Sequence, residues 1–358
     1  MTTITGTVAD GFEPVRDAFQ ANFDRHGELG AGVAVYVGGE LVVDLVGGVA
    51  DEVNRTPYAP DALQLVFSTT KGAAAICAHL LAQRGELDLD APVTDVWPEY
   101  GQAGKGATTI GMLLSHQAGV PVVDDAPSLE RVLEVGPVVE ALAAQAPLWE
   151  PGTAHGYHAL TYGWLVGEVV RRVDGRSLGR FFAEEVAAPL GIEFWIGLPD
   201  DQQDRVVPLV AARPSAEDFD PASLDPEILP LLQDLATAYL DPTSLTNRAL
   251  MLDGRFLLGG GRLAWNLPEV RASEIPAANG VTTARSLAKL YAACVGEVDG
   301  TRLLDAGTVE AATAERSAGR DRVLVVPTRF GAGFMLPSSF SPLLGDRSFG
   351  HPGAGGSL

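Results

Sequence analysis

The sequence has 358 residues, of which 46% are hydrophobic, enough to build a substantial core in one large domain or two closely associated ones. Its 46 acidic and 25 basic residues give a net charge of −21, which disfavours binding to nucleic acid or anionic membranes and favours solubility. No apolar run approaches the ~20 residues that span a membrane, and the N-terminus lacks the features of a signal peptide. We therefore expect a soluble cytoplasmic protein.

The chain opens with a predicted helix and hairpin. Apolar residues recur at helical spacing from Asp10 to His26, which predicts an amphipathic helix. Two β-rich runs at 32–37 and 41–46 flank Gly38-Gly39, which predicts a β-hairpin. The only two cysteines, Cys77 and Cys294, give no disulfide framework, and Cys77 is expected to be a buried thiol.

The stretch from Leu63 to Leu81 carries the strongest chemical signal. An apolar run leads into Ser68, Lys71 follows three residues later, and a helix rich in small residues begins there. Residues three apart on a helix share a face, so the amine of Lys71 can reach the hydroxyl of Ser68. Apolar surroundings lower the pKa of a lysine, and its neutral amine can then act as a base.

Further elements follow along the chain. A short helix with a threonine cap ends near His116, and a longer helix runs from about Leu160 to Val173. Prolines, acidic residues and short apolar runs alternate over residues 200–250, which we interpret as an insertion framing a pocket or lid. A capped helix is predicted from Thr282 or Thr283 through Cys294, with β-structure after it around 329–335 and 348–350.

Three other patterns imitate functional motifs. Gly175–Gly179 spells G-x-S-x-G, but a helix precedes it instead of a strand, so Ser177 is predicted to cap the next helix. Ser286 and Lys289 form a second Ser-x-x-Lys inside an amphipathic helix, where both are expected to face solvent. His155 and His158 are not accompanied by a third ligand at a recognisable spacing, which argues against a metal site.

Taken in order, the motifs resemble the class C β-lactamase-like superfamily of serine hydrolases, most closely the family VIII carboxylesterases of the EstB type. The resemblance covers essentially the whole chain and comprises the opening helix and hairpin, V-F-S-T-T-K, L-L-S-H-Q-A-G-V, W-E-P-G-T-x-H-G-Y-H, A-N-G-V-T-T-A and G-H-P-G. It implies a serine hydrolase that needs neither a metal nor an organic cofactor.

The resemblance assigns catalytic roles to three residues. Ser68 matches the nucleophile, and Lys71 matches the lysine that helps to deprotonate it. Tyr157 matches the tyrosine of the Y-x-N motif, which exchanges protons with the serine and the leaving group. The backbone N–H groups of Ser68 and Ala354 are expected to form the oxyanion hole.

Five further residues are expected around the substrate. His351 and Gly353 fall where the family has K-T-G or H-x-G, and His351 is expected to hydrogen-bond the substrate or the tyrosine, with a structural role as the alternative. The other three come from the remaining motifs: His116, Trp149 and Ala159. For His116, a supporting role near its helix end is favoured over a catalytic one.

Two departures from the family pattern bear on the substrate. Ala159 replaces the asparagine of Y-x-N, and His351-Pro352 replaces Lys-Thr, which removes a cation suited to a substrate carboxylate. Both changes weaken recognition of β-lactams and favour a carboxylesterase that hydrolyses short-chain esters. The alternatives are a β-lactamase, a D-amino-acid peptidase or amide hydrolase, an acyltransferase and a catalytically silent scaffold.

The resemblance also implies the architecture, a β-lactamase/transpeptidase-like α/β (α+β) fold. An antiparallel sheet flanked by helices is expected at 1–67 and 281–358, with a mainly helical domain at 68–280 inserted between its halves and the active site in the cleft. Family members continue beyond the H-x-G strand with further sheet and a closing helix, so an end at Leu358 suggests a truncated chain with exposed apolar sheet surface. The natural substrate, the acyl-chain length and the oligomeric state stay open.

Overall fold

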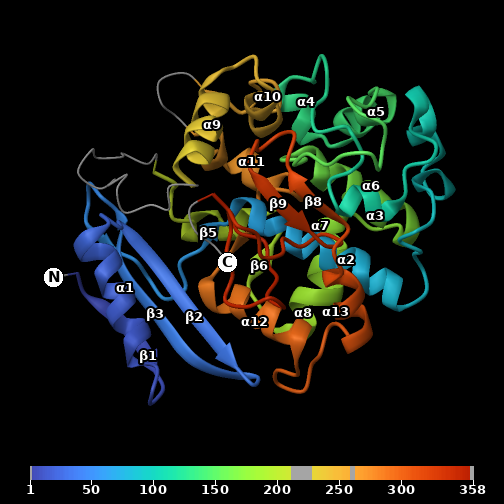
Figure 1. The fold of residues 1–358 in the computed structure, drawn as a ribbon. Helices are drawn as coiled ribbons and strands as arrows, with labels where there is room; N and C mark the ends of the chain where they lie inside the picture. Colours follow the sequence, from blue (N-terminus) through green and yellow to red (C-terminus); the bar gives the residue numbers. More distant parts are fainter. Residues whose placement is uncertain (1, 211–227, 259–262, 355–358) are drawn as a thin grey trace.

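The fold is seen in a computed structural model that describes residues 2–210, 228–258 and 263–354. Within these ranges, no helix is long and apolar enough to cross a membrane. The strands of the described chain form three antiparallel sheets, ordered β1-β3-β2 with β4 on β3, β5-β7-β6, and β8-β9 (Figure 1). Their bounds are β1 Ile4–Val8, β2 Gly30–Val37, β3 Glu40–Asp51, β4 Thr56–Pro57, β5 Gln64–Leu65, β6 Phe194–Trp195, β7 Val281–Thr282, β8 Ser317–Arg320 and β9 Pro327–Phe330.

Helices make up most of the remaining described structure. Helix α1 lies beside β1–β3, whereas most of the others gather on the opposite side of that sheet (Figure 1). The bounds of the first seven are α1 Glu13–Arg25, α2 Thr70–Gln83, α3 Ile110–Leu114, α4 Leu129–Leu133, α5 Gly136–Ala144, α6 Thr161–Asp174 and α7 Leu178–Phe182. A π-helical turn, Ala183–Ala187, joins α7 to α8. The others are α8 Ala188–Leu190, α9 Ile228–Leu240, α10 Leu245–Met251, α11 Pro268–Ala272, α12 Ala284–Val295 and α13 Ala306–Thr313.

The N-terminal sheet separates two helices. Its hairpin β2–β3 and the helix α1 agree with the sequence prediction. Alternate residues of a strand face opposite sides, so Val33 and Val35 pack with Phe19 of α1 while Gly32 faces Ala284 of α12. Helix α12 thus lies on the opposite face of the sheet from α1.

Helix α2 runs through the centre of the main hydrophobic core. All its residues from Thr70 to Leu81 are buried, and the helix packs against α6 and α7. Small side chains permit this close approach: a Cβ at Gly72 would lie 2.1 Å from the hydroxyl of Tyr291. Cys77 is a buried free thiol, as predicted, and so is Cys294. The element that carries the Ser-x-x-Lys lysine is therefore rigidly enclosed.

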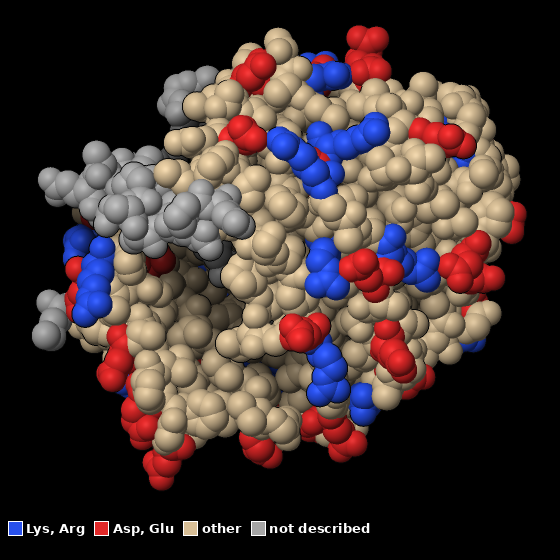
Figure 2. Space-filling view, in the orientation of Figure 1, with Lys and Arg blue, Asp and Glu red and all other residues tan. Residues whose placement is uncertain are grey.

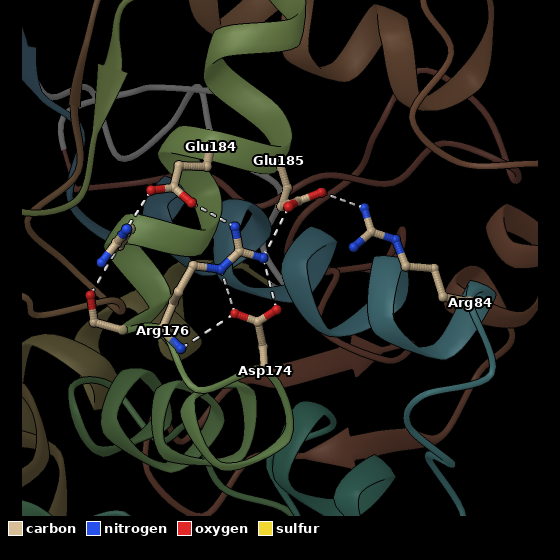
Figure 3. A network of polar contacts seen from close by, with 7 residues as sticks. Arg84, Asp174, Arg176, Glu184 and Glu185 are labelled. Carbon is tan, nitrogen blue, oxygen red and sulfur yellow. Dashed lines mark hydrogen bonds and ion pairs between the residues drawn. The ribbon is translucent and has the colours of Figure 1, made fainter.

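An ion-pair network holds the C-terminal end of α2 to its neighbours (Figure 3). Arg176, just after α6, pairs with Asp174, Glu184 and Glu185 at N–O distances of 2.5, 2.7 and 2.9 Å. Glu185 in turn pairs with Arg84 at 2.6 Å. The network joins α2, α6 and the turn after α7, and a multiply paired arginine stabilises such a junction more than an isolated surface pair does.

A hollow lies between the N-terminal sheet and the helical part of the molecule (Figure 2). It corresponds to a cavity of about 730 Å³, lined mainly by apolar residues of α1, β2, β5 and α12 and by residues 207–210. Ala354 also borders it. Strand β2 hydrogen-bonds to β3 along one edge, and within the described chain its other edge has no strand partner.

Two of the misleading motifs are resolved by their surroundings. Ser177 caps α7 by accepting a hydrogen bond from the N–H of Arg180, as predicted. The prediction that Ser286 and Lys289 face solvent is wrong: Ser286 is buried and its hydroxyl accepts a hydrogen bond from the N–H of Glu193. Lys289 is mostly buried and pairs with Asp299 at 2.7 Å. This serine and lysine each serve the packing of α12.

The segment interpreted as an insertion is partly described. Residues 200–205 form a 3-10 helix, and α9 and α10 lie further along. Residues 207–210 border the cavity, whereas 211–227 lie outside the described residues. The β-structure expected at 329–335 is confined to β9 and to isolated bridges that pair Met335 with Phe330 and with Gly350. Strand β8, which the sequence pattern did not reveal, pairs with β9.

Candidate active site

Ser68 lies in a tight turn at the entrance to α2. The turn Phe67–Thr69 is 3-10 helical and α2 begins at Thr70, so Ser68 precedes the α-helix by two residues. Phe67 has a φ of 46°, a conformation that costs energy in a residue with a Cβ. The hydroxyl of Thr70 stabilises this turn by donating to the carbonyl of Phe67 at 2.6 Å and accepting from the N–H of Gly280 at 2.8 Å.

Lys71 is completely buried beneath Ser68. Its Nζ lies 3.0 Å from Ser68 Oγ, 2.7 Å from the carbonyl oxygen of Ala159 and 3.0 Å from that of Ala277. Among the described residues, no carboxylate forms an ion pair with this amine, and burial lowers the pKa of Lys71 well below its ordinary value. The sequence prediction of a lysine with a depressed pKa is confirmed.

This coordination suits a neutral amine. A neutral lysine has two N–H groups and one lone pair, and Nζ has two carbonyl acceptors and one hydroxyl within reach. When both N–H groups donate to the carbonyls of Ala159 and Ala277, the lone pair faces the O–H of Ser68. In that arrangement, the backbone carbonyls would leave a neutral Lys71 able to accept a hydrogen bond from Ser68.

Tyr157 completes the cluster from the other side. Lys71 Nζ lies 4.7 Å from the centroid of the Tyr157 ring. Burial is the main cause that raises the pKa of the Tyr157 hydroxyl, the negative charge of Asp321 raises it further, and a hydrogen bond with Ser68 opposes the shift. The phenol therefore holds its proton at neutral pH. Tyr157 comes 86 positions after Lys71 in the chain. The fold nevertheless brings it together with Ser68 and Lys71, as the motifs suggest.

His116 and His158 lie behind the tyrosine: the ring of His116 packs on Tyr157, and the ring of His158 packs on His116. The ring of His116 packs 4.8 Å from that of Tyr157, and its Nδ1 accepts a hydrogen bond from the N–H of His158 at 3.1 Å. His158 donates from Nδ1 to the carbonyl of Gly156 and accepts at Nε2 from the N–H of Val120. Burial lowers the pKa of His158 to about 3 and that of His116 well below its ordinary value, so both rings are neutral.

The H-x-G segment lies beside the same cluster. The His351 ring is 6.0 Å from the Tyr157 ring, and burial and the nearby Lys71 lower the pKa of His351 to about 3. Its Nδ1 lies 3.2 Å from the carbonyl of Pro352, while Nε2 has no hydrogen-bond partner among the described residues. Gly353 is partly exposed, and Ala354 borders the cavity, whose lining also includes Val66.

Trp149 and Ala159 lie in different surroundings within the site. Trp149 is buried, packs edge-on against His158 and lies beneath the guanidinium of Arg322, and its Nε1 has no partner in the described chain. Ala159 packs its side chain with Tyr157 and Val122, and contributes its carbonyl to Lys71. At this position the contact with Lys71 comes from the backbone carbonyl, so it does not depend on the side chain and alanine is compatible with it.

His155 takes part in a hydrogen-bonded chain with protein groups. Its Nε2 lies 2.9 Å from Thr328 Oγ1, and Thr328 donates to Asp321 Oδ2 at 3.2 Å. Both residues of the His155/His158 pair are therefore held by other protein groups. Within the described residues, no cluster of three or more histidines, cysteines or carboxylates is placed to hold a metal ion.

Sequence reasoning missed three groups at this site. Thr70 holds the serine turn, the carbonyl of Ala277 binds Lys71, and Asp321 accepts a hydrogen bond from the backbone N–H of Tyr157 at 3.0 Å. Ala277 directly precedes the A-N-G-V-T-T-A motif, which offered a signal for that segment. Asp321 reads as an ordinary turn residue, and only its burial reveals its partners.

A Ser-x-x-Lys pair with a buried lysine next to a tyrosine, in a mixed fold of helices and antiparallel sheet, defines the class of protein. The family model described as Beta-lactamase matches residues 15–358, and the chain belongs to this family of serine hydrolases. The α/β fold with a β-lactamase/transpeptidase-like arrangement, expected from the motifs, is confirmed.

Individual relatives place the chain more finely within the family. It is 35% identical to the esterase/beta-lactamase LipL of Mycobacterium tuberculosis, an alignment that covers 99% of this chain and 79% of LipL. A penicillin-binding protein homologue from Caulobacter crescentus has a similar structure, with 41% identity, a TM-score of 0.81, and coverage of 99% of this chain and 88% of that one. A family VIII carboxylesterase has a TM-score of 0.83 at 37% identity, covering 99% and 89%. The predicted resemblance to family VIII carboxylesterases is thereby confirmed.

Proposed function

We propose that this protein is a serine carboxylesterase that hydrolyses short-chain carboxylic esters through an acyl-enzyme on Ser68. The observation that carries the proposal is the coordination of Lys71, whose Nζ lies within hydrogen-bond distance of Ser68 Oγ and of two backbone carbonyls. A neutral amine that donates to both carbonyls would direct its lone pair at the hydroxyl of Ser68. A buried amine with a lowered pKa can accept the serine proton at neutral pH.

The proposed reaction has two steps. In the first, Ser68 Oγ attacks the ester carbonyl, its proton passes to Lys71, and the alcohol leaves with a proton delivered through Tyr157. In the second, water attacks the acyl-enzyme, gives a proton to the same pair, and the acid departs as Ser68 regains its proton. A phenol that stays protonated at neutral pH suits proton delivery to the departing alkoxide. The backbone N–H groups of Ser68 and Ala354 are the proposed oxyanion hole.

The surroundings favour an ester over a β-lactam. A β-lactam carries a carboxylate, and His351, at the position of the family's lysine, is buried with a pKa lowered to about 3 and therefore offers no positive charge. Ala159 offers no side-chain amide for the substrate. Relatives named as esterases and carboxylesterases agree with this preference, while LipL is named for both activities. A β-lactamase is the second candidate function.

The proposed substrate-binding groups lie around this cluster. We propose His351 and Gly353 as groups that contact the substrate and His116, Trp149 and Ala159 as groups that shape the site from beneath. The burial of His116, Trp149 and Ala159, the partial exposure of Gly353 and the packing of His116 and His351 near Tyr157 support this division. We also propose the domain division at 1–67 and 281–358 against 68–280, supported by the packing of α12 on β2 and of α2 on α6 and α7.

The test is covalent labelling combined with turnover. Intact mass is measured after incubation with a fluorophosphonate, alongside turnover of p-nitrophenyl acetate, p-nitrophenyl butyrate and nitrocefin. We expect one adduct, mapped to Ser68, with fast ester turnover and slow nitrocefin turnover. S68A should lose the adduct and the turnover, whereas S286A, in the second Ser-x-x-Lys, should keep both.

Three outcomes would contradict the proposal. Ester turnover retained by a correctly folded S68A protein would exclude Ser68 as the nucleophile. Rapid nitrocefin turnover by the unmodified protein would favour the β-lactamase alternative. Transfer of the acyl group to an added alcohol in preference to water would indicate an acyltransferase.

A further inference from the structure

Asp321 is a buried carboxylate at the turn between β8 and β9. It is 1% exposed, and its Oδ1 accepts hydrogen bonds from the backbone N–H groups of Tyr157, Val323 and Leu324 at 3.0, 2.8 and 2.8 Å. The bonds to Val323 and Leu324 shape the turn itself. The bond to Tyr157 leaves the turn and reaches a residue 164 positions earlier in the chain. A carboxylate acceptor makes such bonds stronger than a neutral one would.

The second oxygen of Asp321 is tied to the same distant segment. Oδ2 accepts from the hydroxyl of Thr328 at 3.2 Å, and this hydroxyl lies 2.9 Å from His155 Nε2. The N–H of Arg322 also donates to the carbonyl of His155 at 3.1 Å. The β8–β9 hairpin thus holds His155 and Tyr157 through three connections, two from its turn and one from Thr328 of β9.

The opposite side of the Tyr157 segment is held by His116. Its carbonyl accepts from the N–H of Gly156 at 3.1 Å, and its Nδ1 accepts from the N–H of His158 at 3.1 Å. The ring of Phe330, from β9, stacks on that of Tyr157 with an interplanar angle of 16°. The backbone N–H of Tyr157 itself is bound by Asp321, so this carboxylate sets the position of the residue between two fixed neighbours.

We propose that Asp321 is a positioning residue for the reaction, which fixes the backbone of Tyr157 so that the phenol hydroxyl meets Ser68 and Lys71. The expected effect of Asp321 on turnover rests on the proposed function. Its effect on the position of Tyr157 rests on the hydrogen bonds alone. A displacement of ~1 Å in a proton-transferring group costs about 100-fold in rate. The geometry of Asp321 is therefore expected to govern kcat more than substrate affinity.

The charge of Asp321 offers a competing explanation, because it also acts on the Tyr157 hydroxyl. Other titratable groups near Tyr157 include Lys71 from α2, His116 after α3, Tyr162 of α6 and His351. Geometry and charge are separated by a pair of variants. D321N removes the charge and keeps an oxygen for the N–H of Tyr157, whereas D321E keeps the charge and displaces the carboxylate by one methylene.

The experiment compares D321N and D321E in turnover of p-nitrophenyl butyrate. We expect D321E to lower kcat about 100-fold with KM changed less than about threefold, and D321N to stay within about fivefold of the unmodified protein. In the Y157F protein, adding D321E should lower kcat by less than about twofold, because the hydroxyl that Asp321 positions is already absent. The matched controls are D305N and D305E at the exposed cap of α13, where Asp305 accepts from the N–H of Thr308, and both should keep kcat.

A second readout does not depend on turnover. Hydrogen exchange of the Tyr157 amide should be slow in the unmodified protein and in D321N, and faster in D321E. If the unmodified protein hydrolyses no ester, the proposed function fails, and the exchange experiment still judges the hydrogen bond. A loss in D321N as large as or larger than that expected of D321E, with D321E close to the unmodified protein, would overturn the positioning role in favour of charge. The positioning role would also be overturned if D321E lowered kcat by the same factor in the Y157F protein as in the unmodified protein. Unchanged amide exchange and turnover in D321E would overturn it as well.

Discussion

The Nζ of Lys71 lies 3.0 Å from the Oγ of Ser68, and two backbone carbonyls hold that amine in place from behind. One of these carbonyls belongs to Ala159 and the other to Ala277, so two segments far apart in the chain orient one base. Neither carbonyl is charged. The site therefore stabilises a neutral amine, whereas a carboxylate in the same place would hold Lys71 as a cation and remove it as a base.

Replacing Lys71 tests its role as the base. K71M should lower the acylation rate about 1000-fold, since general-base catalysis contributes about 10²–10⁴-fold. In the unmodified protein the rate should fall on the acid side, because an amine protonated below its pKa has no lone pair for Ser68. The measurement is the burst phase of p-nitrophenyl butyrate hydrolysis between pH 5 and pH 9.

The second Ser-x-x-Lys supplies the control for this prediction. Lys289 pairs with Asp299 at 2.7 Å on α12, on a different helix from Ser68, and K289M should leave the rate unchanged. A folded K71M protein with an ordinary burst, or an equal loss in K289M, would contradict the assigned role of Lys71.

The turn that presents Ser68 depends on the hydroxyl of Thr70. In T70V, the carbonyl of Phe67 and the N–H of Gly280 lose their partner, which should lower the free energy of unfolding by about 2–3 kcal/mol. The Ser68 turn should loosen as well, with a lower rate of fluorophosphonate labelling. T70S keeps both hydrogen bonds and should cost less than about 1 kcal/mol. Denaturant unfolding of the two variants measures the difference, and equal stability of T70V and T70S would refute this explanation.

The buried histidines predict a loss of stability in mild acid. Burial lowers the pKa of His158 and of His351 to about 3, so between pH 6.5 and that value the unfolded chain binds protons that the folded chain does not. Stability from these groups is present above pH 6.5 and is lost as the pH falls. With His116, whose pKa is also lowered, the loss between pH 7 and pH 5 should be on the order of 5 kcal/mol.

Calorimetry across this pH range checks the prediction. The midpoint of unfolding should fall steeply from pH 7 to pH 5, and H351N should reduce the slope because one of the titrating groups is gone. The exposed His26 provides the control, since H26Q should leave the slope unchanged. A midpoint that stays constant over this range would contradict the buried neutral state of these rings.

The ion-pair network around Arg176 predicts a measurable effect on thermal stability. R176A leaves three carboxylates, Asp174, Glu184 and Glu185, without their common partner. Like charges then face one another, and the unfolding midpoint should fall by about 2–4 °C at low ionic strength and by less at high salt. R131A removes only an exposed pair at 4.0 Å and should have no measurable effect. Equal midpoints for the two variants would show that the network contributes nothing.

Local patterns in the sequence predicted much of the fold. The spacing of Phe12, Val15, Phe19 and Phe23 predicted α1, and Gly38-Gly39 between β-rich runs predicted the hairpin. Helix caps were equally local: Thr109, Ser177 and Thr283 each accept the expected backbone hydrogen bond. These features depend on residues close together in the chain, so the sequence displays them directly.

Ser286 shows where local reasoning failed. Its helix is amphipathic, and its position beside the apolar face suggested exposure, but the backbone of Glu193 approaches it and uses its hydroxyl. Strand β8 was missed for a similar reason, since Ser-Ala-Gly-Arg has no strand pattern and pairs only because β9 lies beside it. A partner distant in sequence decided both cases.

In the active site, too, some features follow from residues close together in the chain and others only from contacts between distant segments. The sequence by itself determined the Ser68–Lys71 pair, because a spacing of three residues places both groups on one face at a helix start. Only the tertiary structure decided the state of that lysine, by burying it and giving it the carbonyls of Ala159 and Ala277. It likewise decided that Asp321 holds Tyr157, a contact across 164 residues. Hydrogen bonds between distant segments and the exclusion of water arise only when the chain packs, and those two effects convert the motif into the buried cluster for which we propose a base and an acid.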